Sequence, residues 1–530
     1  MKRWNGWGDE SVVPHLSTAS THFLQRQIGV GRPTRDASFQ EVIERVPASR
    51  LPAHTLISTD TRERLLHARG QSLPDWIALR SGCIDIFPDG VAYPESESQV
   101  RELISFAAEV DARLIPYGGG TSVVGHINPL PGEQPVVTVD LKRMSNLKLL
   151  DERNHLATFG VGIAGLPLEA QLRAHGFTLG HYPQSFEYST LGGWIATRSS
   201  GQQSLGYGRI EQLFAGGRVE TPSGTLQVPA LPAAAAGLDL REIILGSEGR
   251  LGILTEATVR VRPLPEQESY FAIFFPDWEQ GLTAARHVVQ ARLPLTMLRL
   301  STPVETQTQL VLAGHERVVS ALERVLALRG AGQDKCMLMV GTAGRERDVK
   351  RARKEVLGIA HEQKGVSAGS TLGEQWHKKR FQTPYLRNTL WQMGYAVDTV
   401  ETATTWDCVP DLIQAIETAL RSALKAESEQ VHAFTHLSHL YAHGSAIYTT
   451  YLYRIADSPD ETLRRWKALK GAASQAIVAG HGTISHQHGI GCDHQQYLIA
   501  EKGPLGLSAM RQLYSHFDPK GMMNPGKLVL

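Results

Sequence analysis

The sequence predicts an α+β fold built from two main units. Between Val91 and Tyr117, a strand, a helix and a second strand follow one another, and a run of glycines ends the series. That order is typical of a βαβ-like unit. From residue 266 to residue 480, strand-like stretches alternate with helix-like ones, which indicates a second unit of antiparallel strands and helices.

The first unit opens with a short strand at Val91–Pro94. An amphipathic helix follows at Ser96–Val110, with its first residue as the N-cap and Gln99 at the capping-box position. The next strand is Arg113–Tyr117. A later helix, Pro167–Gly176, starts with Pro and ends with Gly, which is the usual asymmetry of helix ends. Further strands are predicted at Val136–Leu141, His155–Gly162 and, as a pair, Gly252–Pro265.

The second unit is predicted to begin with the strand Tyr270–Pro276 and to contain another at Lys335–Gly344. Its helices are expected at Trp278–Ala291, Glu316–Ala327 and Arg345–Glu362. The predicted division is an N-terminal extension at 1–87, a first unit at 88–265, a second unit at 266–480 and a C-terminal segment of short helices at 481–530 that completes the active site.

Composition excludes several classes of protein. The 530 residues carry a net charge of +1, and 42% of them are hydrophobic, which argues against disorder and against a nucleic-acid binder. The four cysteines include no C-x-x-C pair, so neither a disulfide framework nor a cysteine zinc site is expected. The N-terminus lacks an apolar h-region, and no apolar run reaches the roughly 18 residues of a membrane span. We therefore expect a cytoplasmic protein.

Glycine is the compositional outlier, and its placement is informative. Of the 50 glycines, 22 fall between Gly118 and Gly252, about a quarter of the chain. Glycine lets the main chain approach a ligand closely, because it has no Cβ. This enrichment is expected where a backbone wraps a dinucleotide.

Three glycine-punctuated segments lie in this region. Pro116–His126 (PYGGGTSVVGH) follows a strand, and its consecutive glycines allow several N–H groups to turn toward one anion. It matches neither the Walker A loop nor the G-x-G-x-x-G fingerprint. Ser185–Leu213 interleaves small, hydroxyl and glycine residues around an apolar centre, and Gly246–Pro265 is a turn that enters a strand. Taken singly, each segment is equally compatible with a structural turn.

In order and spacing, the three segments resemble the PCMH-type FAD-binding domain of the vanillyl-alcohol oxidase superfamily. The resemblance implies a two-subdomain FAD-binding domain followed by a cap domain with an antiparallel sheet. It also implies FAD, bound non-covalently, because His126 lacks a clear attachment signature. The cofactor-binding residues that it implies are Pro116, Gly118, Gly119, Gly120, Thr121, Ser122, Ser189, Thr190, Gly192, Gly193, Thr197, Ser200, Glu248, Gly249, Gly252 and Ile253.

Other segments narrow the resemblance to the alkyl-dihydroxyacetonephosphate synthases and their bacterial relatives. Trp4–Gly8 (WNGWG) is similar to the start of that family, and His481–Gly491 (HGTISHQHGIG) looks like its triple-histidine motif, with Gln487 in place of the middle histidine. The closing Asn524–Leu528 (NPGKL) is shared with flavin-dependent 2-hydroxyacid dehydrogenases. Further similar stretches are Arg64–Gly82, Trp376–Leu390, Val400–Asp407 and His436–Tyr453.

The resemblance implies an ether-lipid transferase. Such an enzyme exchanges the acyl group of acyl-dihydroxyacetonephosphate for a fatty alcohol, through a substrate adduct at flavin N5 and without net redox change. It implies Tyr448 as the proton-transfer group, whose pKa near 10 would need lowering by neighbours to make it a base. Arg387 would clamp a phosphate or carboxylate, and His486 and His488 would bind phosphate or relay protons. The alternative interpretation of Tyr448 is a strand-core tyrosine, and that of Arg387 is a surface helix residue.

The alternative function is an FAD-dependent oxidoreductase that takes hydride from a 2-hydroxy acid or a related alcohol. Gln487 and the NPGKL tail favour it, whereas WNGWG, the segment around Arg387 and Tyr448 favour the transferase. The expected partner is an amphiphilic phosphate-bearing lipid or a small hydroxy acid, with no nucleic acid. Peripheral membrane contact and a homodimer are left open.

Histidines also raise the question of a metal. His432, His436, His439 and His443 would share one face of a helix. We read Thr435–Tyr441 as a strand instead, which places His436 and His439 on opposite faces. No H-E-x-x-H motif is present, so no metal is expected. The charged run Gly344–Val356 is interpreted as a solvated helix face, with contact to anionic headgroups as the alternative.

Overall fold

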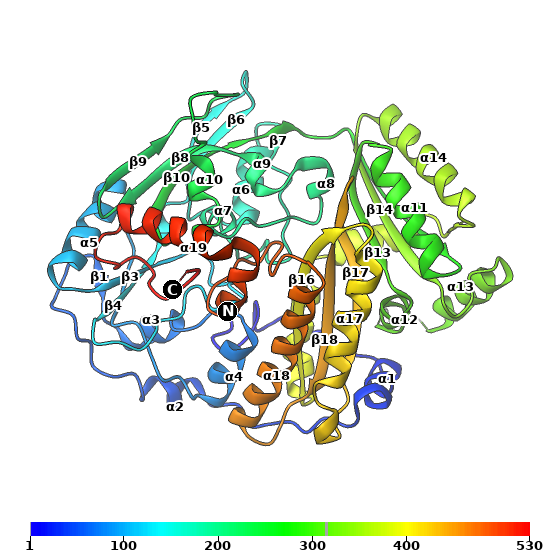
Figure 1. Ribbon diagram of the computed structural model, residues 1–530, viewed down its shortest axis with the longest axis horizontal. Coiled ribbons are helices and arrows are strands. Elements are labelled where there is room, and N and C mark those ends of the chain that lie inside the picture. The colour runs from blue at the N-terminus through cyan, green and yellow to red at the C-terminus, as the bar shows by residue number, and fades with distance from the viewer. Residues whose placement is uncertain (1, 313–315, 530) are drawn as a thin grey trace.

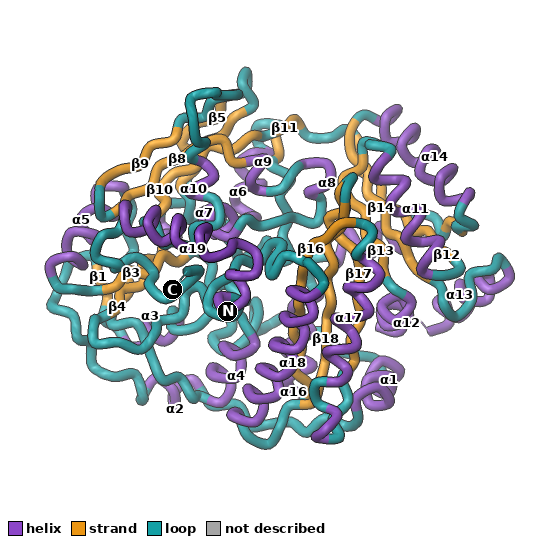
Figure 2. The backbone as a smooth tube through the Cα atoms, viewed as in Figure 1, coloured by secondary structure: helices purple, strands orange, loops and turns teal. Residues whose placement is uncertain are grey.

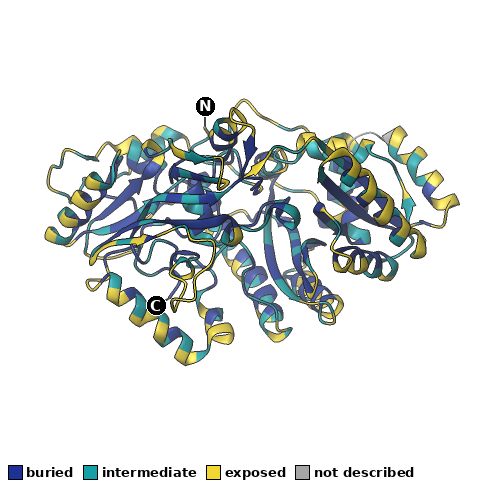
Figure 3. Cartoon of the chain, turned by 90° about the horizontal axis from the view of Figure 1, so that it is seen from above, coloured by how far each residue is buried: buried dark blue, intermediate teal, exposed yellow. Residues whose placement is uncertain are grey.

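Four β-sheets organise the part of the chain that the computed structural model describes, residues 2–312 and 316–529. Figure 1 shows two lobes side by side: most of residues 2–265 with the red C-terminal helix form one, and residues 266–480 form the other, with the blue helix of residues 18–28 beside it. Loops and short helices fill the space between the large sheets of the two lobes (Figure 2). Strands lie inside both lobes, and the outer faces of the helices are exposed (Figure 3).

The first sheet contains the predicted strand–helix–strand unit, but a third strand lies between the two predicted strands. Strands β2 (Gly90–Ala92) and β3 (Arg113–Tyr117) both run parallel to β4 (Val136–Asp140), which lies between them, and α5 (Glu97–Glu109) connects them. Every residue of β4 is buried. A strand buried on both faces is expected at the centre of a parallel sheet, and β4 takes that place. The short β1 (Ile57–Ser58) adds an antiparallel edge.

The second sheet has five antiparallel strands in the order β5–β6–β10–β8–β9. Buried residues alternate along β10 with partly exposed ones, as expected for a strand with one face on a core. The bounds are β5 (Leu147–Asp151), β6 (Leu156–Gly160), β8 (Phe214–Thr221), β9 (Gly224–Val228) and β10 (Ile253–Arg260). A two-stranded ribbon joins β7 (Phe177–Thr178) to β11 (Arg262–Pro263).

The third large sheet confirms the expected antiparallel cap. Its order is β15–β12–β14–β13–β17–β18–β16, with every neighbouring pair antiparallel. The bounds are β12 (Gln267–Phe275), β13 (Leu295–Ser301), β14 (Cys336–Gly344), β15 (Val366–Ser367), β16 (Tyr395–Thr405), β17 (His432–Tyr441) and β18 (Gly444–Arg454). His432–Tyr441 is therefore a strand and not a helix.

Helices cover one whole face of this cap sheet and form the largest core with it. They are α11 (Trp278–Gln290), α14 (Glu346–Glu362), α17 (Val409–Ser422) and α18 (Pro459–Ala479) (Figure 1). On the other face, α12 (Pro303–Leu312), α13 (Glu316–Leu328) and α15 (Thr371–Lys379) pack over β12, β14 and β13. The half formed by β17, β18 and β16 turns that face toward the first lobe.

The N-terminal region connects the two lobes. Helix α1 (Thr18–Ile28) packs on cap residues that include Leu390 and Tyr395, while α4 (Leu73–Ser81) contacts α18. The C-terminal segment contains a short 3₁₀ turn at Gln495–Tyr497 and α19 (Leu498–Phe517), which the non-helical Gly503 divides into two shorter helices, as expected. The remaining helices of the first lobe are α2 (Phe39–Ile43), α3 (Thr61–Leu66), α6 (Gly165–Arg173), α8 (Ser204–Tyr207), α9 (Ile210–Leu213) and α10 (Arg241–Ile244).

Candidate active site

The glycine loop after β3 has the geometry of an anion cradle. A Cβ on Gly118 would lie 2.2 Å from Thr190 Oγ1, and one on Gly119 would lie 1.7 Å from the Tyr188 carbonyl oxygen, so only glycine fits. The backbone N–H groups of Gly119–Ser122 donate to no other protein group among the described residues. Lys2 Nζ, which donates to the Gly119 carbonyl at 2.9 Å, places a positive charge beside them. These free donors and this charge suit a pyrophosphate.

Three distant segments meet beside this loop. The amide nitrogen of Asn524 donates to the carbonyls of His126 (3.1 Å) and Glu248 (2.7 Å). The Glu248 carboxylate accepts from the N–H groups of Ile490 (2.6 Å) and Gly491 (2.9 Å). Glu248 has a φ of 52°, in the left-handed region that non-glycine residues rarely adopt. The NPGKL tail and the histidine segment are thus bound directly to the third glycine segment.

The middle segment forms α7 (Leu191–Thr197), whose N-cap is Thr190. Trp194 Nε1 donates to Ser189 Oγ at 2.7 Å, which fixes the start of this helix. Ser200 Oγ and Asn524 Oδ1 are buried without a hydrogen-bond partner in the described part of the chain. Buried polar atoms of this kind need a partner, and a bound dinucleotide supplies one. The residues present therefore fit FAD.

One row of the cap sheet carries polar and aromatic side chains that include the candidate Tyr448. Ser301 on β13 pairs with His436 on β17, His436 with Tyr448 on β18, and Tyr448 with Glu401 on β16. Paired residues of neighbouring strands point to the same face of a sheet. The next residues along each strand, including Leu437 and Ile447, point the other way into the core.

Tyr448 lies between two imidazoles. Its ring stacks on His436, with centroids 5.0 Å apart, and meets His488 edge-on at 6.1 Å. Burial raises the pKa of Tyr448 to about 12, with the Thr399 hydrogen bond opposing this effect. The lowering that Tyr448 would need to act as a base is therefore absent, and the phenol is protonated at neutral pH.

Glu401 organises the segment that contains His486 and His488. Its Oε1 accepts from the backbone N–H groups of Gln487 (2.7 Å) and His488 (2.8 Å), and both imidazole Nδ1 atoms lie within 3.7 Å of the carboxylate. Although burial opposes it, the two histidines and these N–H groups hold the pKa of Glu401 well below its usual range. The Gln487 Oε1 atom is buried without a hydrogen-bond partner in the described chain.

A second set of contacts holds His486 from the first lobe. Arg209 donates to the His486 carbonyl at 2.9 Å, and its other terminal nitrogen lies 2.5 Å from His486 Nε2. The Tyr441 hydroxyl is 2.6 Å from the same Nε2. Arginine can only donate, so Nε2 is an acceptor and His486 carries its proton on Nδ1, toward Glu401. Burial lowers the pKa of His486, which is consistent with a neutral ring.

A β-bulge changes the side on which His439 lies. The pairing of β17 with β18 shifts between Ser438 and Leu440, and His439 has a φ of 53°. Its ring stacks on His486 at 5.3 Å and so faces the site. The prediction that His436 and His439 lie on opposite faces is wrong, because strict alternation ends at a bulge. No group of three or more His, Cys, Asp or Glu residues in the described part of the chain could hold a metal ion.

Arg387 is a cation without a carboxylate partner among the described residues. It lies on α16 (Leu386–Gln392), with its guanidinium 4.3 Å from the centre of the Trp76 ring and one N–H donating to the Gln71 carbonyl. No carboxylate of the described residues pairs with it, whereas Arg209 pairs with Glu211 and Arg299 with Glu305. The charge of Arg387 is therefore left for a ligand.

Next to Arg387, Asn388 anchors the N-terminal segment that contains WNGWG. Asn388 accepts from the N–H of Trp7 and donates to its carbonyl, at 3.2 Å and 2.9 Å. The Trp7 ring packs edge-on against Tyr188 beside the glycine loop. This segment therefore links the glycine loop to the helix that carries Arg387.

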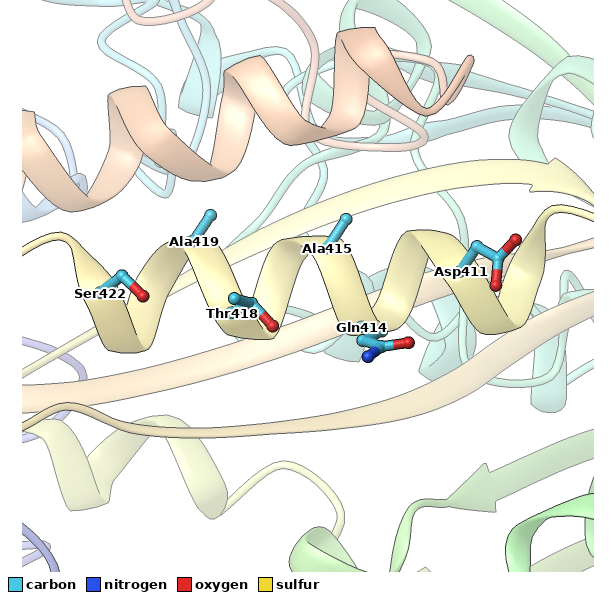
Figure 4. Close-up of a pocket in the computed structure, with 6 residues that line it drawn as sticks. All are labelled: Asp411, Gln414, Ala415, Thr418, Ala419 and Ser422. Carbon is cyan, nitrogen blue, oxygen red and sulfur yellow. The ribbon is translucent and has the colours of Figure 1, made fainter.

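A surface pocket elsewhere lacks these features. Figure 4 shows that a single helix, α17, supplies all the side chains that line it. They are Asp411, Gln414, Ala415, Thr418, Ala419 and Ser422. It lies on the far side of the cap sheet from Tyr448 and has no counterpart among the predicted site residues.

Comparison with known proteins gives the family. Residues 88–228 match the FAD binding domain family, and residues 264–528 match the family of FAD linked oxidases, C-terminal domain. The alkyldihydroxyacetonephosphate synthase of Dictyostelium discoideum is 31% identical over 498 residues, which cover 93% of this chain and 81% of that protein. The chain belongs to the alkyldihydroxyacetonephosphate synthase family. FAD is accordingly the cofactor that the cradle fits.

Two further members of the alkyldihydroxyacetonephosphate synthase family extend the likeness to the whole chain. The synthase of Trypanosoma brucei brucei is 29% identical, covering 99% of this chain and 92% of its own length. A solved alkyldihydroxyacetonephosphate synthase structure superposes with a TM-score of 0.85 at 28% identity, covering 99% of this chain and 98% of that one. The antiparallel cap and the flavin-binding lobe are thus common to both.

Sequence reasoning named Tyr448, His486, His488 and Arg387 as candidate site residues but missed the residues that hold them. Glu401 lies within the similar stretch Val400–Asp407, and only its hydrogen bonds reveal its role. Arg209 lies inside the second glycine segment and gives no signal of its own. The pairing that joins His436 to Glu305 spans 131 residues, so no local pattern reports it.

Proposed function

We propose that this chain is an FAD-dependent alkyldihydroxyacetonephosphate synthase, which exchanges the acyl group of acyl-dihydroxyacetonephosphate for a fatty alcohol. The observation that carries the proposal is the meeting of Tyr448, His488 and Arg387, which come from three separate motifs. Tyr448 and His488 are in ring contact, and Arg387 lies in the neighbourhood of Tyr448. Family membership over nearly the whole chain supports the same reaction.

Bound FAD supplies an electrophilic ring that can accept electron density from a substrate carbon. The chain's own contribution begins with binding. When FAD is bound, the N–H groups of Gly119–Ser122 and the Lys2 ammonium would hold its pyrophosphate, and the segments around Thr190 and Glu248 would contact the rest of the dinucleotide.

Arg387 binds the phosphate of the substrate. Its planar fork matches a phosphate oxygen pair, and Trp76 stacks beneath the guanidinium so that the fork keeps one orientation. Because no carboxylate of the described residues pairs with this guanidinium, the substrate phosphate can neutralise its charge.

Tyr448 acts as a neutral donor at the reacting end of the substrate. With a pKa of about 12, the phenol keeps its proton and can donate a hydrogen bond to an oxygen that gains negative charge. His488, held by Glu401, lies on the other side of the same ring.

One anaerobic experiment tests the proposal. Purified holoenzyme is mixed with acyl-dihydroxyacetonephosphate and a long-chain alcohol, while the flavin absorbance and the ether product are followed together. The proposal expects an ether product with no net loss of the oxidised flavin spectrum. Bleaching of the flavin by a 2-hydroxy acid, without any acyl-for-alkyl exchange, would establish the oxidoreductase instead.

We further propose peripheral contact with a membrane. No helix in the described part of the chain has both the length and the hydrophobicity to cross a bilayer. Ile499 and Leu505, on either side of the kink in α19, are 53% and 84% exposed and support surface contact. Flotation with lipid vesicles tests this, and recovery of all the enzyme in the lipid-free fraction would contradict it. The homodimer stays a prediction.

A further inference from the structure

A buried carboxylate–imidazole pair lies directly behind Tyr448. Glu305, 1% exposed, sits in the first turn of α12, and its Oε1 is 3.0 Å from His436 Nδ1. Arg299 (2.6 Å) and Gln309 (2.9 Å) donate to the same oxygen. The pKa of Glu305 is lowered to about 2, because His436 and Arg299 outweigh the effect of burial. Glu305 is therefore an anion throughout the neutral range.

The contacts fix where the proton of His436 lies. A carboxylate can only accept, so the His436 Nδ1 that faces Glu305 must carry the hydrogen. Arg299 also approaches this Nδ1, at 3.2 Å, but the same arginine nitrogen is closer to Glu305 Oε1, at 2.6 Å, and we assign its hydrogen to that carboxylate. With Nδ1 protonated, the lone pair of a neutral His436 is on Nε2.

Nε2 of His436 has no hydrogen-bond partner in the described part of the chain, and it is not among the fully enclosed unpaired atoms. The ring stacks on Tyr448 in the row that faces the flavin-binding lobe. The charged and titratable groups around His436 are Arg299 on β13, Glu305 on α12, His439 on β17, Tyr448 on β18 and Glu401 on β16. Burial and Arg299 lower the pKa of His436, while Glu305 raises it.

The proposed reaction needs a base, and Tyr448 is unsuited to that role because its phenol is protonated. A carboxylate that fixes the tautomer of an imidazole and stabilises the imidazolium is the arrangement used for general bases in hydrolases. Glu305 and His436 provide this arrangement next to the tyrosine.

We propose that His436, oriented by Glu305, is the general base that removes the proton from the substrate carbon bearing the acyl group. The C–H bond breaks and the Nε2–H bond forms. The electron pair passes to the adjacent ketone oxygen as an enolate, which Tyr448 stabilises by donating its hydroxyl. Glu305 balances the imidazolium charge, and His436 returns the proton in a later step. The assignment rests on the transferase function proposed above.

The first test is hydrogen exchange without alcohol. Holoenzyme and acyl-dihydroxyacetonephosphate are incubated in deuterium oxide, and deuterium uptake at the substrate carbon is measured by mass spectrometry. His436→Gln should slow uptake by about 10²- to 10⁴-fold, the usual contribution of a general base. His432→Gln is the matched control, because His432 lies on the same strand but bonds to Thr308, away from Tyr448. It should keep a rate within about twofold of wild type.

The second test uses Glu305→Gln and the pH dependence of uptake. Without the anion, the imidazolium loses its partner and the pKa of His436 falls. Because the base works only when neutral, the acid limb of the profile should move to lower pH as the maximal rate declines. His436→Gln should lack this limb. Proton NMR adds a readout that does not depend on turnover: a strongly downfield imidazole N–H signal, present in wild type and absent from both variants.

The outcomes separate this proposal from the function on which it rests. If wild type exchanges acyl for alkyl and His436→Gln takes up deuterium at the wild-type rate, His436 is not the base and the transferase stands. If wild type catalyses neither exchange nor uptake, the transferase itself fails. A missing downfield N–H signal in wild type would contradict the Glu305–His436 pairing whatever the reaction.

Discussion

At the scale of single residues, the charged side chains of the site differ from one another: some are paired with an opposite charge of the protein and others are not. Arg209, Arg299 and Lys470 each have a carboxylate within 4 Å, whereas Arg387 has none in the described part of the chain. Asp493 shows the opposite case: a carboxylate oxygen that is buried without a hydrogen-bond partner. An unpaired cation can bind a substrate anion. Burial of a carboxylate without a partner raises its pKa, because the charged form is poorly solvated.

Arg387→Gln should weaken substrate binding more than it slows chemistry. A charge-assisted hydrogen bond is worth about 1.5–3 kcal/mol, so kcat/KM should fall about 10- to 150-fold, mainly through KM. Arg387→Lys should recover only part of this, because lysine lacks the planar fork. Arg347→Gln, at an exposed surface arginine, is the control. Steady-state kinetics check the prediction, and equal effects of the two glutamine variants would contradict it.

Asp493→Asn should stabilise the protein at pH 8 but not at pH 4. Burial raises the pKa of Asp493 to about 7, so the folded state binds more protons than the unfolded state between pH 4 and pH 7. Stability is therefore lost as pH rises through this window, and asparagine removes the loss, worth about 2–4 kcal/mol. Urea denaturation at both pH values measures it. The exposed Asp411→Asn control should change stability by less than about 0.5 kcal/mol at either pH.

At this scale the sequence predicted the residues that carry chemistry better than those that hold them. Tyr448 and His488 follow from local motifs. Glu305 and His436 do not, since their contact depends on the packing of α12 against β17, which no spacing encodes. The raised pKa of Tyr448 also follows from burial and not from residue type, so the sequence alone does not reveal it.

At the scale of elements, the N-terminal segment acts through close packing against the helix of Arg387. Gly6 and Gly8 lie where any Cβ would collide with Asn388 Oδ1 (2.4 Å) or the Tyr385 ring (2.2 Å). Tyr385 and Asn388 flank Arg387 in the chain, so displacement of either one should move the guanidinium. The WNGWG pattern is thus explained by contact with α16.

Gly8→Ala should reduce both stability and activity. Gly8 has a φ of 74° and crowds Tyr385, whereas Gly176 has a φ of 78° and open space around it. Gly176→Ala therefore isolates the backbone strain, about 1–2 kcal/mol, and should leave kcat/KM unchanged. Gly8→Ala should cost more than this and lower kcat/KM. Denaturation and kinetics on both variants check the difference, and identical losses with full activity would refute the role of this segment.

Element bounds were largely predictable where periodicity is strong. Helices α11, α13 and α14 begin and end within one residue of their expected bounds, and β3 matches its own. Two features were not predictable. β4 inserts between β2 and β3, because strand order depends on burial and not on chain order. The bulge at His439 adds one residue to β17, and its sequence contains no glycine that would signal it.

At the scale of the whole molecule, the histidine segment joins the two lobes. Glu401 of the cap and Glu248 of the flavin-binding lobe both accept backbone N–H groups from Gln487–Gly491. Flavin binding and the position of the cap should therefore be coupled through this segment.

Glu248→Gln should weaken that coupling. A glutamine cannot accept with both terminal atoms, so one buried N–H loses its partner at a cost of about 1–3 kcal/mol. We expect a lower FAD content after purification and a lower melting temperature. Glu256→Gln, on the same strand region but paired with Lys148 at the surface, should change neither by much. Flavin absorbance and thermal unfolding measure both, and full FAD retention in Glu248→Gln would contradict the coupling.

The row Ser301–His436–Tyr448–Glu401 has a consequence for how such enzymes diversify. Each position belongs to a different strand, and each strand is held by the core on its opposite face. A member other than Glu401 can therefore be exchanged by a single substitution while the strands stay in place, whereas Glu401 also holds the N–H groups of Gln487 and His488. A related enzyme could therefore acquire a new reaction through successive substitutions in this row. Protein engineering can test this by varying the four positions of the row.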